Sequence, residues 1–152
     1  MDFLRSLFAN KAFLAGLGGW AVAQVAKTII YAIINKKFEF ERLVGAGGMP
    51  SCHSSMVCGL ATATGMMYGG GSIEFALALC FAIIVMYDAM NVRMETGRQG
   101  KILNDMIEIF QNMGKNISPE ESLKELVGHT PLQVLIGALT GIIVAIVIVR
   151  FL

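Results

Sequence analysis

Four apolar segments, separated by polar connections, decide what this chain of 152 residues can fold into. A helix needs roughly 20 apolar residues to cross a hydrocarbon core of about 30 Å. Residues 12–35, 72–92 and 131–152 reach that length, whereas residues 54–69 are fewer and include glycines and threonines. This shorter segment is either a span or a re-entrant or buried helix. We count it as a span, because its small residues permit close packing against neighbouring helices.

Composition supports a membrane protein. Hydrophobic residues make up 55% of the chain and charged residues 15%, and the mean hydropathy is +0.66. The charges are concentrated in the connecting segments, which argues against nucleic acid as a partner. We therefore expect an all-α integral membrane helical bundle of about four spans, forming one domain over residues 1–152, with a cytoplasmic amphipathic helix within residues 93–128.

The basic residues predict the orientation of the bundle, because cytoplasmic loops are rich in Lys and Arg. Arg5, Lys11 and Arg150 fall on one side of a four-span topology. The larger group falls on the other side: Lys36, Lys37, Arg42, Arg93, Arg98, Lys101, Lys115 and Lys124. We expect that second side to be cytoplasmic and both termini to be non-cytoplasmic. Residues 1–9 are amphipathic and run into the first span without a cleavage site, so we expect no removable signal peptide.

The connection between the last two spans contains a helical pattern. Apolar residues recur at helical spacing with polar residues between them: Ile102, Leu103, Met106, Ile107, Phe110 and Met113. Such a helix either lies on the membrane surface or covers a site. Residues 118–121 (SPEE) have the form of a capping box with proline at the first helical position, so a second, short helix is expected to end at Gly128.

Lys27 is the clearest anomaly, because a charge inside a span requires a partner or a water-filled cavity. The bland alternative is that it extends to the cytoplasmic interface. More than two helical turns separate it from the basic pair that follows the span, which favours a functional role.

Other ionisable groups stand at the ends of the remaining spans. His53 opens the second after a Pro-Ser turn, Asp88 and Arg93 close the third, and His129 precedes the fourth. Alternating span directions bring these groups, with Lys27, to one membrane face. Separately, each could be a headgroup contact or an interfacial ion pair. Together they are typical of a site that processes an anion. The cysteines, Cys52, Cys58 and Cys80, show neither disulfide nor zinc spacing, and we expect neither metal nor cofactor.

Three motifs carry a family resemblance: residues 47–54 (GGMPSCHS), 87–93 (YDAMNVR) and 128–131 (GHTP). In this order they resemble the divergent, small-membrane-protein branch of the acid phosphatase and vanadium-dependent haloperoxidase superfamily, which includes the type 2 phosphatidic acid phosphatases. The resemblance covers nearly the whole chain, including Lys27. It implies a metal-independent lipid-phosphate phosphatase that works through a phosphohistidine.

The resemblance also implies a role for each residue. His129 would attack phosphorus, and His53 would protonate the leaving alkoxide. Lys27 and Arg93 would hold the phosphate oxygens, assisted by helix-start amides near Ser51 and Gly48.

The chain departs from the superfamily pattern in three places. Cys52 replaces a glycine, and Gln133 replaces an aspartate four residues after the nucleophile. Leu123 and Lys124 stand where a serine-arginine pair is expected. We expect Asp88 to supply the missing carboxylate and Arg93 to replace the missing arginine.

The expected substrate is a lipid phosphate at the cytoplasmic interface, with phosphatidate, phosphatidylglycerophosphate and polyprenyl phosphates all compatible. A different reading is a non-enzymatic transport or scaffold subunit with an intramembrane ion relay. Haloperoxidase chemistry with bound vanadate fits a membrane-embedded pocket poorly. Small-residue pairs at Gly137 and Gly141 and at Ala15 and Gly19 would serve helix association and permit a homodimer.

Overall fold

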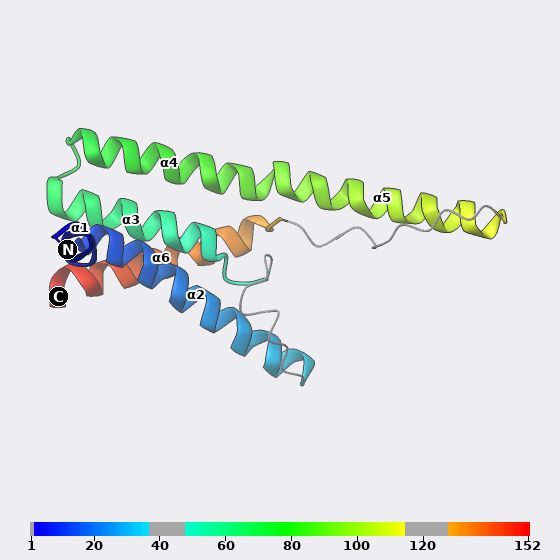
Figure 1. The fold of residues 1–152 in the computed structure, drawn as a ribbon, viewed down its shortest axis with the longest axis horizontal. Coiled ribbons are helices and arrows are strands. Elements are labelled where there is room, and N and C mark those ends of the chain that lie inside the picture. The colour runs from blue at the N-terminus through cyan, green and yellow to red at the C-terminus, as the bar shows by residue number, and fades with distance from the viewer. Residues whose placement is uncertain (1, 37–47, 115–127) are drawn as a thin grey trace.

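The computed structural model describes residues 2–36, 48–114 and 128–152, and helices joined by short turns make up its regular secondary structure over these residues. Six helices follow one another in the described part of the chain (Figure 1): α1 (Asp2–Phe8), α2 (Lys11–Asn35), α3 (Cys52–Tyr68), α4 (Ile73–Met90), α5 (Val92–Asn112) and α6 (Pro131–Phe151). The predicted all-α helical bundle is thus confirmed. The short helix expected after residue 118 lies outside the described residues.

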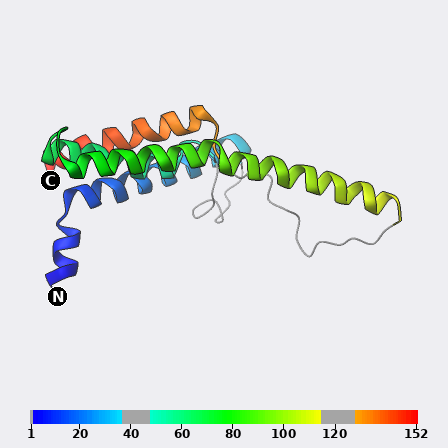
Figure 2. The same ribbon diagram turned by 90° about the horizontal axis from the view of Figure 1, so that it is seen from above.

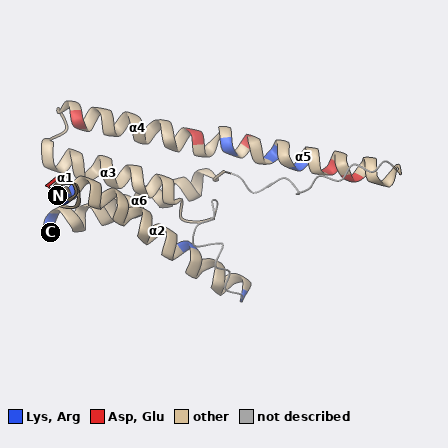
Figure 3. Ribbon diagram, in the orientation of Figure 1, with Lys and Arg blue, Asp and Glu red and all other residues tan. Residues whose placement is uncertain are grey.

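Among the described residues, three stretches are long and apolar enough to cross a membrane: Lys11–Asn35, a window within Ile73–Asn112, and Pro131–Phe151. Figure 3 shows that Lys, Arg, Asp and Glu are sparse in the bundle and recur along α5. The fourth predicted span corresponds to α3, whose 17 residues fall short of a typical span. Counting α3 as a span stays a prediction.

The centre of the bundle is α3, which packs against α2, α4 and α6. Its backbone comes very close to its neighbours because glycines stand at the contacts. A Cβ on Gly59 would lie 2.7 Å from the Ala15 carbonyl oxygen, and one on Gly19 would lie 2.8 Å from that of Ser55. Gly141 of α6 meets the same Ser55 carbonyl from the other side. The small residues predicted to permit close packing do so inside one chain.

These contacts show which helices the two small-residue pairs, Gly137 with Gly141 and Ala15 with Gly19, bring together. Gly137 and Gly141 face the carbonyl oxygens of Ser51 and Ser55, and Gly19 faces Ser55 as well. The pairs therefore join α2 and α6 to α3 in the same molecule. Because their surfaces are already covered, they supply no argument for a homodimer.

The N-terminal helix α1 is separate from α2, whereas the sequence had suggested a continuous run into the first span. Asn10 interrupts it, since its side chain accepts hydrogen bonds from the backbone N–H groups of Ala12 and Phe13 at 2.9 and 3.2 Å. An N-cap of this kind begins a new helix. Figure 2 shows α1 turned sharply away from the axis of α2.

Helices α4 and α5 continue in one direction with only Asn91 between them (Figures 1 and 2). Together they cover 40 residues, and at about 1.5 Å per residue they extend about twice the thickness of a hydrocarbon core. The expectation of a helix in this segment is confirmed for α5. Its expected place, on the membrane surface or over the site, stays a prediction; α5 projects along the line of α4 (Figures 1 and 2).

Candidate active site at the end of the bundle

The predicted site residues come from α2, from the beginnings of α3 and α6, and from the junction of α4 with α5. The beginnings of α3 and α6 and the junction of α4 with α5 lie at one end of the bundle (Figure 1), while both termini lie at the other. The Ser51 and Thr130 side chains cap α3 and α6. The resulting arrangement brings His53, His129, Asp88 and Arg93 to the same end.

The two histidines lie beside each other. Their ring centroids are 6.1 Å apart, with the ring planes inclined at 61°. His129 is almost fully buried, whereas His53 is partly exposed. One ring is therefore held inside the protein, and the other is partly accessible from outside.

His129 is fixed in position by its backbone. Its N–H group donates to the carbonyl oxygen of Ala89 at 3.0 Å, which ties the start of α6 to the end of α4. Gly128, just before it, has φ of +105° and lies directly against the backbone of Met94, where no side chain would fit. From the sequence, Gly128 was expected to end a short helix and to begin the GHTP motif, and nothing in the sequence pattern indicated its close approach to α5.

The His129 ring is fixed by Gln133. Nδ1 of His129 lies 3.3 Å from the Gln133 side-chain oxygen, which also accepts the backbone N–H of Thr130 at 3.1 Å. Because Thr130 N–H can only donate, the Gln133 atom facing it must be the oxygen. A ring nitrogen bonded to that oxygen must carry hydrogen, so the contact favours the tautomer protonated on Nδ1.

Burial lowers the pKa of His129 below the ordinary value of 6.5, and the charges of Lys27 and Arg93 lower it further. Hydrogen bonds to Gln133 and to the Gly48 backbone act in the opposite direction. The net effect is a lowered pKa. The ring is therefore neutral, with a lone pair on one nitrogen, over a wider pH range than an exposed histidine.

Lys27 is 4% exposed although it lies within the longest apolar helix. Gly48 packs against its methylene groups, since a Cβ on Gly48 would lie 3.0 Å from both Cγ and Cδ of Lys27. Gly48 also has φ of +83°, a backbone conformation that suits glycine. The charge of Lys27 also acts electrostatically on both histidines. Lys27 therefore does not extend to the interface as a solvated side chain.

Asp88 and Arg93 form an ion pair, with 2.6 Å between Arg93 Nε and Asp88 Oδ2. Both side chains are partly exposed, at 38% and 46%. The expectation that Asp88 orients His129 in place of the family's aspartate does not match this geometry, because Asp88 bonds Arg93 and it is Gln133 that bonds the His129 ring.

Ser51 differs from the other site candidates. It is fully buried, its N–H group donates to the Gln133 carbonyl oxygen at 3.1 Å, and its hydroxyl caps Ser54. Its own N–H group is thus already bonded, and a phosphate contact by the helix-start amides near Ser51 stays a prediction. The residue joins α3 to α6. Within the described residues, no cluster of three or more His, Cys, Asp or Glu side chains could hold a metal ion.

The Divergent PAP2 family matches this sequence over residues 8–144, which include every described residue of the site. The chain belongs to that family. A curated relative, the "Uncharacterized membrane protein YuiD" of Bacillus subtilis (strain 168), is 35% identical, covering 95% of this chain and 98% of its own length. No solved structure matches the chain. The protein is thus a multi-pass membrane protein of a phosphatase-related family.

Proposed function

We propose that this protein hydrolyses the phosphate monoester of a membrane lipid at the cytoplasmic interface, with a phosphohistidine as intermediate. The observation that carries the proposal is the pair of adjacent histidines, one of them buried with its Nδ1 bonded to Gln133. Membership of a PAP2-related family supports the same chemistry.

His129 is the nucleophile. With hydrogen held on Nδ1 by Gln133, the Nε2 lone pair attacks phosphorus and the bond from phosphorus to the ester oxygen breaks. A lowered pKa keeps this lone pair available near neutral pH. The leaving alkoxide takes a proton from His53, whose ring lies 6.1 Å from that of His129. In the second step His53 removes a proton from water as the water attacks phosphorus, the P–N bond breaks, and inorganic phosphate leaves.

Lys27 and Arg93 bind the phosphate oxygens. Both cations act electrostatically on both histidines, which supports a shared role for them at one bound phosphate. Fixed cations in a partly buried site stabilise the charge that develops on the phosphoryl oxygens. Asp88 holds the Arg93 guanidinium in place through the 2.6 Å ion pair. Gln133 is a positioning residue, since it contacts His129 and not the substrate.

The position of the site favours a lipid substrate. The histidines stand where the apolar lengths of α4 and α6 end, so a phosphate here would keep its hydrocarbon chain at the depth of the membrane. The described basic residues beyond this end include Lys36, Arg98 and Lys101, whereas Arg5, Lys11 and Arg150 belong to the opposite end. By the positive-inside rule, the site faces the cytoplasm and both termini lie on the other side.

The test is phosphate release by purified protein reconstituted in vesicles. Phosphatidate, phosphatidylglycerophosphate and a polyprenyl phosphate are supplied in turn, each with and without chelator and orthovanadate. We expect release from at least one lipid, unaffected by chelator and inhibited by orthovanadate. Failure to release phosphate from every lipid would contradict the proposal.

Trapping the intermediate separates the two histidines. Labelled substrate should leave label on the wild-type protein and none on His129→Ala. His53→Ala should still take up label from a substrate with a good leaving group, because that first step needs no proton donor. Equal and mild losses in both variants would exclude these roles.

A further inference from the structure

An apolar groove of about 400 Å³ lies between α3, α4 and α6, away from the histidines. Its floor consists of small residues, among them Cys58, Ala61, Gly65 and Ala82. Larger apolar side chains form its edges: Met66, Phe75, Leu79, Met86 and Ile142. The groove exists because the floor residues carry too little side chain to fill the space between the helices.

The groove runs along the depth of the bundle, starting below the histidine site. Cys58 lies five residues after His53 on α3, and Met86 lies two residues before Asp88 on α4. The sulfur atoms of Cys58 and Met86 are 3.6 Å apart and mark the end nearest the site. From Cys58 to Met66 the helix rises roughly 12 Å, at about 1.5 Å per residue. The groove therefore begins one to two helical turns below the site, at a depth that the hydrocarbon chain of a lipid bound there would reach.

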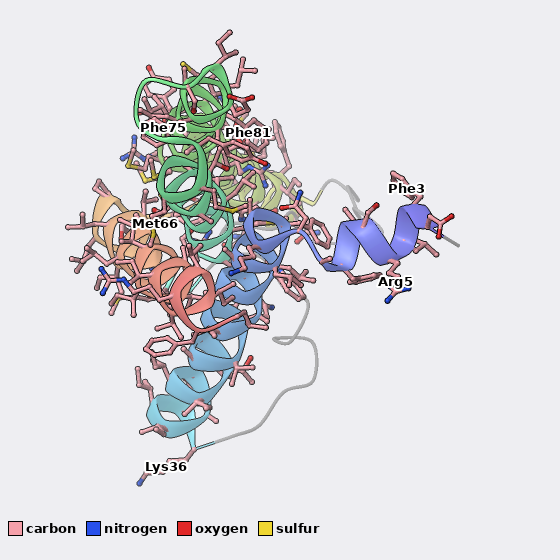
Figure 4. All side chains as sticks on the ribbon, turned by 90° about the vertical axis from the view of Figure 1, so that its left-hand side faces the viewer. Phe3, Arg5, Lys36, Met66, Phe75 and Phe81 are labelled. Atoms are coloured by element: carbon pink, nitrogen blue, oxygen red, sulfur yellow. The ribbon has the colours of Figure 1, made fainter. Side chains whose placement is uncertain are left out.

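The far end of the groove is closed by Phe75. A Cβ on Gly65 would lie 2.8 Å from two ring atoms of Phe75, so the ring rests directly on the backbone of α3. Figure 4 shows Met66 and Phe75 on the side of α3 and α4 that faces α6, whereas Phe81 lies on the opposite side of α4. The groove is thus lined from one side of α4, and Phe81 lies on the other side of that helix.

We infer that this groove holds one hydrocarbon chain of the lipid whose phosphate is bound at the histidines. The inference rests on the proposed function and adds a chain-binding site to it. Lipid tails are as apolar as the groove, so moving a chain from the bilayer into it gains little hydrophobic free energy. Its contribution is orientation: a seated chain brings the phosphate repeatedly to the same place between the two histidines. Flexible methionines at the edges suit a chain of variable shape.

Activity on two substrates tests the inference. Leu79→Trp fills the groove from α4, and Phe81→Trp adds the same ring on the opposite side of the same helix. On a long-chain lipid phosphate, Leu79→Trp should lower kcat/KM by about tenfold, a loss of the size that one apolar pocket contact gives. Phe81→Trp should resemble wild type. On a water-soluble phosphate ester without a long chain, all three proteins should be alike. A Leu79→Trp variant with unchanged discrimination between the two substrates would overturn the inference.

Photocrosslinking provides a readout that does not need turnover. A lipid phosphate with a diazirine in mid-chain is added to the full-length protein in vesicles, and the labelled residues are mapped by mass spectrometry. We expect adducts at groove residues such as Thr62 and Leu79, and competition by unlabelled lipid phosphate but not by a neutral lipid with the same chains. If unlabelled lipid phosphate reduces these adducts but the protein releases no phosphate, the groove binds a lipid chain and the proposed hydrolysis is refuted. Adducts spread equally to Phe81 and insensitive to competitor would refute the groove.

Discussion

The side-chain oxygen of Gln133 lies 3.3 Å from Nδ1 of His129 while it also caps the first turn of α6 through Thr130. One amide thus starts the helix and orients the ring. The PAP2-related superfamily uses an aspartate at this position, and a glutamine differs from it in one respect. It can accept the Nδ1 hydrogen, but it cannot stabilise the positive charge of an imidazolium.

Replacements of Gln133 should distinguish its role in orienting the His129 ring from the effect of a charge at this position. Gln133→Leu removes the acceptor, and kcat should fall by about 10- to 100-fold, the usual cost of losing a partner that orients a histidine. Gln133→Asp keeps the acceptor and adds charge, so activity should persist and the pKa of His129 should rise. Thr130→Ala is the control, because it removes the cap to the Gln133 N–H group, at about 1 kcal/mol of stability, without touching the ring. Equal activity losses in Thr130→Ala and Gln133→Leu would mean that only helix stability matters.

The lowered pKa of His129 gives a prediction for the pH profile. Below its pKa the ring is protonated and has no lone pair, so activity falls on the acid side. Since burial and the nearby cations lower that pKa, the acid limb of kcat/KM should lie below 6.5. Lys27→Met removes one of those cations and should move the limb to higher pH while weakening substrate binding. If the acid limb of kcat/KM lies at the same pH in Lys27→Met as in wild type, Lys27 does not act on the nucleophile.

The ion pair between Asp88 and Arg93 should matter for binding more than for folding. Asp88→Asn frees the guanidinium, so KM should rise several-fold. Both side chains are partly exposed, and such pairs contribute less than about 1 kcal/mol to stability. Glu95→Gln is a matched control, because it breaks the 3.2 Å pair with Arg98 on α5, outside the site. If the two variants have the same KM, Arg93 does not bind the phosphate.

Because Gly141 contacts the Ser55 carbonyl, α6 should not tolerate a larger side chain at this position. Gly141→Ala forces the helices apart, and we expect a loss of about 1–3 kcal/mol or more, as in overpacked cores. The measurement is thermal unfolding in detergent. Gly71→Ala is the control, since a Cβ there would meet nothing within 4 Å. A Gly141→Ala protein as stable as Gly71→Ala would show that α6 does not pack this closely on α3.

The sequence by itself determined the elements and the chemical types. Hydrophobic length marked α2, α4 and α6, because a helix in lipid must satisfy its own backbone and bury few charges. The same reasoning singled out Lys27 as a buried cation, and alternating helix directions were enough to expect His53, His129, Asp88 and Arg93 at one end.

Tertiary structure decided which of these groups touch. The pairing of Asp88 with Arg93, and of His129 with Gln133, depends on helix rotation and on backbone approach at Gly128 and Gly48, which periodicity does not encode. The burial of Ser51, the direction of α5 and the groove beside α3 also follow from packing. Spacing along a chain sets which residues share a helix face, but only packed neighbours determine what that face meets.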